Sequence, residues 1–381
     1  MDEVADALVE SFRHEHGGDP DGVFAAPGRV NLIGEHTDYN GGLCLPIALE
    51  HATYVAVRRR EDRRLQVASK QQVDSFTIHL DDFEPAAVDG WPAYVVGVLW
   101  ALEAAGVPVP GMDLLIDSRV PVGAGLSSSA ALECAVGLGA CALAGIDLDD
   151  SQRHQLIDAC MRAEREVVGA PTGGMDQTIA VFGQAEHALL IDFADGSLAQ
   201  VPWTVPDVEI LVVDTRAHHA LNDGQYGSRR AECEEAAKAL GVERLGDVAN
   251  PREALHLLDD RLRPRARHVF TESSRVRAAV QTIQDQDSAE LGRVFTESHT
   301  SLRDDFAVSC AELDVTVEAA IAAGAYGARM TGGGFGGSAI ALVHPQRLAE
   351  TRSAVTRAFE RHGFPAPAFL LARPSRGARR V

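Results

Sequence analysis

The chain has 381 residues, of which 46% are hydrophobic and 24% charged, and its formal net charge is −20. This length allows two domains of ordinary size, and the balance of apolar and charged residues is that of a folded globular protein. The negative charge would repel a nucleic-acid backbone or an anionic membrane surface, so neither is expected as a partner.

The cysteines and the apolar stretches indicate where the protein works. Six cysteines are scattered without a CxxC pair or a histidine at metal-ligand spacing, so we expect reduced structural thiols. Residues 1–10 lack the basic and apolar regions of a secretory signal. The weakly charged stretch 120–146 is interrupted by glycine and serine, and its apolar run 134–146 is too short to cross a bilayer. We therefore expect a cytoplasmic protein, and we expect a monomer.

In the N-terminal half, short strand-like patterns alternate with longer helical ones. Strands are expected at 53–58, 75–80 and 113–117. Helices are expected at 91–105, at about 126–144 and at about 151–168, with Asp149 or Asp150 as the N-cap of the third.

The C-terminal half also has a mixture of predicted strands and helices. Strands are expected at 188–192, 210–214, 338–343 and 368–371, and helices near 228–240, 268–284, 289–304, 311–323 and 345–362. These patterns predict two α+β domains, residues 1–192 and 193–381, joined near 183–207. The tail 373–381 contains four arginines and is expected to be a solvated or loosely docked terminus.

The segment from Gly28 to Pro46 concentrates side chains that make directional hydrogen bonds. Glycines around them allow tight backbone turns. A polyhydroxylated sugar needs such a set, because a misplaced hydroxyl leaves a buried partner unpaired. A surface loop of solvated charges is the alternative interpretation. The polar residues are Arg29, Asn31, Glu35, His36, Asp38 and Asn40, and the glycines are Gly28, Gly34, Gly41 and Gly42.

A second segment, PVGAGLSSSAALE at 121–133, precedes the second predicted helix. Its glycines let backbone N–H groups approach an anion, and its serines begin a helix whose N-terminal dipole favours phosphate. It lacks the GK[ST] ending of a Walker A loop, so a different nucleotide fold is indicated. Helix capping alone would also explain such a Gly–Ser turn.

Two further glycine-rich segments are less specific by themselves. TGGMDQ at 172–177 places Asp176 on a predicted turn, where it could accept the proton of an attacking hydroxyl. Glu164, with a serine hydroxyl, is a plausible Mg²⁺ ligand. A turn-stabilising Asp176 and a solvated Glu164 are the alternatives. The run MTGGGFGG at 330–337 permits close backbone approach to a ligand or loop, or is simply a strand-entry turn.

Taken together, these segments resemble the GHMP kinase superfamily, and the first resembles its galactokinase branch. GRVNLIGEHTDYN followed by LPIAL is similar to the sugar-binding signature of that branch, PVGAGLSSSAALE to its ATP-binding motif and MTGGGFGGSAIAL to its third motif. The stretches WPAYVVGV, RHVFTESSRV and SHTSLRDDFAVSCAELD also resemble galactokinases. The resemblance therefore covers essentially the whole chain.

The resemblance implies an α+β, two-domain GHMP kinase fold with the active site between the domains, and phosphorylation of galactose at its C1 hydroxyl by MgATP. It implies that Asp176 is the base or orients that hydroxyl, while Arg29 holds Asp176 ionised and stabilises charge on the transferred phosphoryl group. Sugar hydroxyls would be bound by Glu35, His36, Asp38, Gly173, Asp176 and Tyr226. Phosphates would contact Gly123, Gly125, Leu126, Ser127, Ser128 and Ser129. Ser128 and Glu164 would hold Mg²⁺, and Trp91 is either a wall for the adenine or a core residue.

One stretch departs from the family, and two other functions stay open. Where galactokinases often have an Asn and an Arg, this chain has Arg216 and His218, although the neighbouring His219 and Tyr226 are kept. The departure leaves the fine sugar specificity open, so a kinase for N-acetylgalactosamine or arabinose is one alternative. A non-catalytic sensor of galactose and ATP is the other, but sensors have an altered Ser–Ala run, whereas 127–131 is intact here.

Overall fold

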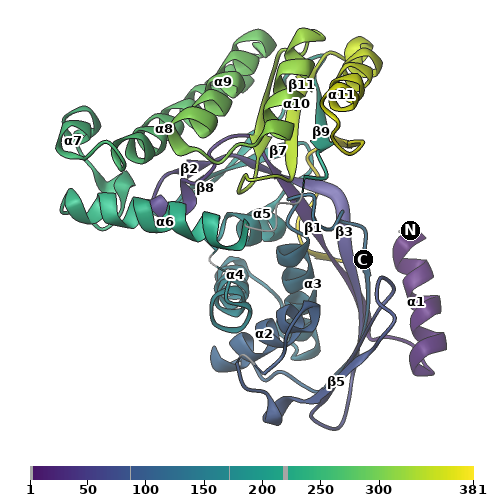
Figure 1. The fold of residues 1–381 in the computed structure, drawn as a ribbon. Helices are drawn as coiled ribbons and strands as arrows, with labels where there is room; N and C mark the ends of the chain where they lie inside the picture. Colours follow the sequence, from purple (N-terminus) through teal and green to yellow (C-terminus); the bar gives the residue numbers. More distant parts are fainter. Residues whose placement is uncertain (1–2, 86, 171, 218–221) are drawn as a thin grey trace.

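The structure, a computed structural model, describes residues 3–85, 87–170, 172–217 and 222–381. Within these residues the strands form three sheets, and helices pack on their faces in two domains (Figure 1). The α+β class with two domains is confirmed. The division at residues 192 and 193 stays a prediction.

The N-terminal domain is built on a sheet in which all neighbouring strands but one pair are antiparallel. The exception is the parallel pair of β4 and β6. The order of the strands across the sheet is β13 (Arg379–Arg380), β1 (Gly22–Asn31), β3 (Pro46–Arg59), β6 (Met112–Ser118), β4 (Arg64–Ser69) and β5 (Phe76–His79).

Helices cover both faces of this sheet (Figure 1). Successive side chains of a strand point to opposite faces, so β3 contributes to two cores. Val55 and Val57 pack in the core under the helical layer, whereas Tyr54 and Ala56 pack against the N-terminal helix on the other face. That helix is α1 (Glu3–His16), and the helical layer consists of α2 (Trp91–Ala104), α3 (Ser128–Leu143), α4 (Asp150–Ala163) and α5 (Met175–Phe182).

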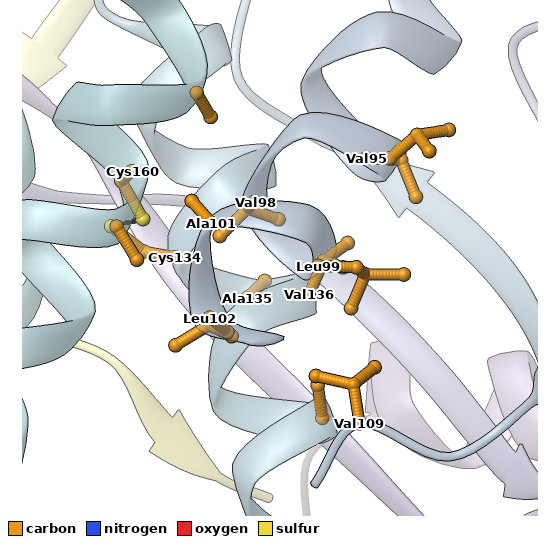
Figure 2. Close-up of a cluster of buried hydrophobic side chains, with 14 of the residues drawn as sticks. Val95, Val98, Leu99, Ala101, Leu102, Val109, Cys134, Ala135, Val136 and Cys160 are labelled. Carbon is orange, nitrogen blue, oxygen red and sulfur yellow. Dashed lines mark hydrogen bonds between the residues drawn. The ribbon is translucent and has the colours of Figure 1, made fainter. Parts of the chain in front are cut away.

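The helical layer has a dry core that holds α2, α3 and α4 together. Figure 2 shows Leu99 of α2 beside Val136 of α3. Cys134 of α3 and Cys160 of α4 face each other with their sulfurs 3.9 Å apart, and both are buried free thiols. This packing fixes α3, whose N-terminus carries the serine run of the second motif.

The C-terminal domain has a sheet with strand order β10 (Gly327–Thr331), β11 (Ser338–Val343), β9 (Glu209–Asp214) and β12 (Ala368–Ala372). A third, small sheet has the strand order β2 (Leu43–Cys44), β7 (His187–Asp192) and β8 (Leu198–Pro202). The helices of this half are α6 (Asn222–Ala239), α7 (Pro251–Leu257), α8 (Arg263–Gln284), α9 (Ser288–Ser301), α10 (Ala311–Ala322) and α11 (Leu348–His362). None of the helices among the described residues is long and apolar enough to cross a membrane.

Two predicted helices end in a turn of π-helix, a feature often found at functional sites. The helix expected at 151–168 is α4, which ends at Ala163, followed by π-helical residues Glu164–Val168. Its predicted N-cap, Asp149, accepts a hydrogen bond from the backbone N–H of Gln152. After α9, the π-helical residues are Leu302–Phe306. Glu164 therefore projects from a widened turn rather than from a regular helix.

The prediction of a solvated or loosely docked C-terminal tail is wrong. Arg379 and Arg380 form β13, which pairs with Ala25 and Phe24 of β1. The N–H of Val381 donates to the carbonyl of Val23 at 3.0 Å. The backbone of β1 would otherwise leave donors and acceptors unpaired at a sheet edge, and the tail satisfies them. The end of the chain thus returns to the N-terminal sheet.

Candidate active site

A cavity of about 600 Å³ lies where the two domains meet. It is lined by Arg29 of β1 and the segment after β1, by the π-helical turn after α4 and the residues that follow it, by the start of α5, by one residue of α6 and by the glycine-rich loop after β10. Every sugar-binding and catalytic candidate named from the sequence lies on it, together with Glu164 and two glycines of the fourth motif. The lining includes Arg29, Glu35, His36, Asp38, Glu164, Gly173, Asp176, Tyr226, Gly332 and Gly333.

Arg29 and Asp176 form a two-pronged ion pair at the base of this cavity. Nε of Arg29 donates to Oδ1 of Asp176 at 2.8 Å, and Nη2 donates to Oδ2 at 2.8 Å. Nη1 donates to the carbonyl of Gly125 in the second motif at 2.5 Å. Arg29 is 6% exposed, and it sits on β1. A paired guanidinium and carboxylate in this arrangement fix each other's orientation.

Asp176 lies in the first turn of α5, which begins at Met175, rather than on the glycine-rich turn that the sequence predicted. The N-cap is Gly174, and the positive end of the helix dipole favours a carboxylate there. The hydroxyl of Ser127 also donates to Oδ2 of Asp176. One carboxylate therefore contacts both Arg29 and the serine run.

Glu35 and His36 are buried in the wall of the cavity and are held by neighbouring groups. The Glu35 carboxylate pairs with Arg329 through one oxygen and accepts the Gly332 N–H through the other, at 3.0 Å. Nε2 of His36 donates to the carbonyl of Gly333 at 3.1 Å, so Nδ1 accepts from the Tyr39 hydroxyl at 2.9 Å. Burial, with the nearby His268, lowers the pKa of His36 to about 3, which leaves its ring neutral.

Asp38 also lines the cavity, and it belongs to the segment from Gly28 to Pro46, which we call the sugar segment. Burial, followed by the charge of Asp176, raises the pKa of Asp38 to about 6. The Gly173 backbone packs against the Asp38 carboxylate, where a β-carbon would collide with it. Gly173 is therefore required for close packing between the turn and the sugar segment.

Tyr226 extends from α6 over the sugar segment. Its ring centroid lies 5.2 Å from that of His36 and 5.9 Å from that of Tyr39. Burial raises the pKa of the Tyr226 hydroxyl well above its ordinary value, so the hydroxyl keeps its proton. Aromatic and polar groups thus surround one polar pocket.

The second motif lies against the fourth, which explains two glycine-rich segments at once. The hydroxyl of Ser338 donates to the carbonyl of Ala124 at 2.7 Å, and Gly332 and Gly337 both approach Gly125. Gly123 and Gly125 are exposed, as a phosphate-binding loop requires. Leu126 is buried in the core, so any phosphate contact from it would come from its backbone.

Glu164 is a buried carboxylate beside the serine run. Burial, followed by the charge of Asp176, raises the pKa of Glu164 to about 6, and hydrogen bonds from Ser129, Gln177 and Thr172 oppose this. Ser129 is thus among the groups that lower the pKa of Glu164, whereas the sequence paired Glu164 with Ser128. The predicted pairing stays untested, and Ser129 joins it as a candidate.

Trp91 and Arg216, two further candidates from the sequence, do not line the cavity. Trp91 is the first residue of α2 and packs half-buried against the N-terminal core, so both interpretations of it stay open. Arg216 is exposed, and its backbone N–H donates to Asp214. His218 and His219 lie outside the described residues.

The sequence did not single out three residues behind the cavity that are completely buried. Arg329 on β10 and His268 and Glu272 on α8 are each 0% exposed. For Arg329 a signal was available: it is a charged residue in a strand pattern, directly before the glycine-rich run MTGGG. His268 and Glu272 lie in the stretch RHVFTESSRV, which resembles galactokinases, but only the folded chain brings them to the sugar segment.

Three protein-family models match successive parts of the chain. Residues 10–59 match the galactokinase galactose-binding signature, residues 93–184 the GHMP kinases N terminal domain and residues 276–361 the GHMP kinases C terminal domain. The chain is 47% identical to the galactokinase of Streptomyces coelicolor, and the match covers 99% of both chains. The chain belongs to the galactokinase family.

Other relatives agree with this assignment. The galactokinase of Mycobacterium tuberculosis is 45% identical over 91% of this chain and 95% of its own. The crystal structure of Lactococcus lactis galactokinase complexed with galactose superposes with a TM-score of 0.94 at 34% identity, covering 99% of this chain and 100% of that one. A mevalonate kinase at 16% identity, with a TM-score of 0.67, shows the shared GHMP kinase fold alone.

Proposed function

We propose that this galactokinase-family chain transfers the γ-phosphoryl group of MgATP to the C1 hydroxyl of D-galactose, giving galactose 1-phosphate and ADP. The observation that carries the proposal is the contact of Asp176 with Ser127. It joins the carboxylate of the sugar cavity to the serine run that begins α3, so the acceptor hydroxyl and the phosphates would meet at one point.

In this proposal charged and neutral groups together hold the sugar by directional hydrogen bonds. Glu35, His36 and Asp38, with Gly173 and Tyr226, bind hydroxyls, because each lines the cavity. Galactose and glucose differ only at C4, so an inverted hydroxyl would leave a buried polar group without a partner. The galactose-bound relative supports this choice of sugar.

The chemistry rests on the Arg29 and Asp176 pair. The C1 hydroxyl donates to Asp176, which accepts its proton during attack or holds it in line with the phosphoryl group. Arg29 keeps the carboxylate oriented and places positive charge where the phosphoryl group passes. The phosphates lie on the exposed loop of Gly123 and Gly125 at the N-terminus of α3, with Trp91 as the proposed wall for the adenine.

The residues present fit a magnesium ion beside this pair. Glu164 is a buried carboxylate close enough to Asp176 for their charges to repel, and a cation would relieve that repulsion. We propose that Glu164 holds the ion with Ser128, as the sequence predicts, or with Ser129. Bound Mg²⁺ would neutralise charge on the phosphates of ATP.

The function is tested by a coupled assay of ADP release with galactose, N-acetylgalactosamine, arabinose and glucose at saturating MgATP. We expect turnover with galactose and much poorer turnover with glucose. Absence of turnover with galactose would contradict the proposal, and turnover with another sugar would favour a different kinase. A cytoplasmic location and a monomeric state stay predictions from the sequence.

A further inference from the structure

The sugar segment is held from behind by α8 of the C-terminal domain. His268 and Glu272 lie one helical turn apart on α8, so they share a face of the helix. Nε2 of His268 donates to the carbonyl of Glu35 at 3.1 Å, and Oε1 of Glu272 accepts the N–H of Gly34 at 3.1 Å. Two adjacent residues of the sugar segment are thus held through their backbone atoms.

The geometry of Gly34 explains why its backbone needs this support. Gly34 has a φ of +101°, a left-handed conformation, and a β-carbon there would collide with the backbone around Leu43. The chain turns at this point, shortly after the end of β1 at Asn31. The direction of the Glu35 and His36 side chains therefore depends on how Gly34 is held.

The supporting residues are themselves held in place. Glu272 also accepts the hydroxyl of Ser298 at 2.5 Å and Nε of Arg275 at 2.7 Å. Nδ1 of His268 accepts the hydroxyl of Ser301 at 2.9 Å, which leaves Nε2 with the proton that it donates to Glu35. Ser298 and Ser301 belong to α9, so two helices brace the contact.

A third buried residue completes the support from β10. Arg329 pairs with the Glu35 carboxylate, donates to the carbonyl of Leu32 at 2.8 Å and lies 3.7 Å from Glu272. None of His268, Glu272 and Arg329 lines the sugar cavity, so they act through the residues that do.

We propose that His268 and Glu272 are positioning residues for galactose: they hold the Gly34–Glu35 backbone so that Glu35 and His36 point into the cavity, and they set affinity for the sugar without touching it. Arg329 supports them through the Glu35 side chain. This inference rests on the proposed role of Glu35 and His36 in sugar binding. Sugar affinity is thus controlled partly from the C-terminal domain.

A pair of matched substitutions at His268 tests the proposal. The amide of Gln reaches the position of Nε2, so His268→Gln keeps the donor to Glu35. The amide of Asn reaches only the position of Nδ1, so His268→Asn keeps the contact with Ser301 and loses the one with Glu35. Both variants keep a polar amide in a buried site, and they differ in which contact survives.

We expect His268→Asn to raise the KM for galactose about tenfold, the effect of losing one buried hydrogen bond. His268→Gln should stay near the wild type, and the KM for ATP should change little in either variant. Glu272→Leu should behave as His268→Asn, and Glu272→Gln as His268→Gln. Galactose affinity measured by calorimetry without ATP provides a second readout.

Asp113 supplies a control for stability. It is 2% exposed and pairs with Arg58 and Arg60 on the N-terminal sheet, away from the sugar segment. Asp113→Leu should lower Tm and leave the KM for galactose unchanged. An equal KM for galactose in His268→Asn and His268→Gln, or an equal rise in the KM for ATP, would overturn the proposal. Failure of the wild type to use galactose would instead contradict the proposed function.

Discussion

The carboxylate of Asp176 accepts hydrogen bonds from Nε and Nη2 of Arg29, each at 2.8 Å, although the two residues are 147 positions apart in the chain. The pair joins β1 to the first turn of α5 and faces the cavity in which the sugar segment lies. Because Asp176 and Arg29 make distinct contacts, substituting one residue at a time tests the role of each.

Asp176→Asn should remove most turnover while leaving ATP binding nearly unchanged. The amide keeps the shape of the side chain but cannot accept a proton, and the loss of a general base typically costs about 10²- to 10⁴-fold in kcat. Initial rates and ATP titration by calorimetry measure the two effects. A variant with wild-type kcat would show that Asp176 is not essential as a base.

Arg29→Lys should lower kcat far more than it raises the KM for galactose. A lysine keeps the positive charge but cannot donate to both carboxylate oxygens and to Gly125 at once. The expected loss in kcat is about 10²-fold, as for other groups that stabilise transition-state charge. If kcat is retained and only KM rises, the role of Arg29 is confined to the ground state.

Asp38→Asn should stabilise the folded protein at neutral pH while impairing activity. Burial and the charge of Asp176 raise the pKa of Asp38 from 3.8 to about 6, so the folded state disfavours its ionised form. The contribution of Asp38 to stability therefore falls as pH rises from about 4 to about 6. Asp38→Asn removes this cost, which is about 1 to 3 kcal/mol.

Urea unfolding at pH 4 and pH 8 measures this effect. The variant should be more stable than the wild type at pH 8 and similar to it at pH 4 or below, with a higher KM for galactose. A variant that is less stable at both values of pH would show that Asp38 supports the fold through contacts of its charged form.

Glu164→Gln should raise the Mg²⁺ concentration needed for half-maximal rate, because the neutral amide is a poorer ligand for a hard cation. Ser129→Ala should have a larger effect than Ser128→Ala, since Ser129 is the serine that favours the ionised form of Glu164. Rates measured against free Mg²⁺ at fixed ATP give the comparison. A shift in Ser128→Ala alone would support the ligand pair predicted from the sequence.

The sequence by itself determined the elements whose signals are local. The strand at 338–343 and the helices near 91–105 and 311–323 were predicted from periodicity, and the structure confirms them as β11, α2 and α10. Of the two N-caps expected from the sequence, Asp149 and Asp150, the structure shows Asp149, whose capping box joins residues three positions apart. The first, third and fourth motifs named many of the residues that line the cavity, since each motif is a contiguous segment.

The tertiary structure decided what depends on contacts between distant segments. Asp176 was expected on a turn, but packing of α5 places it at a helix N-terminus, where it meets Arg29 and Ser127. The C-terminal tail gave no strand signal, and it becomes β13 because β1 presents an open edge. In the sequence, His268 and Glu272 are ordinary residues of a predicted helix. Their role depends on the packing of α8 behind Gly34. They contact backbone atoms there, and every residue has these atoms, so no pattern in the sequence reveals the contact.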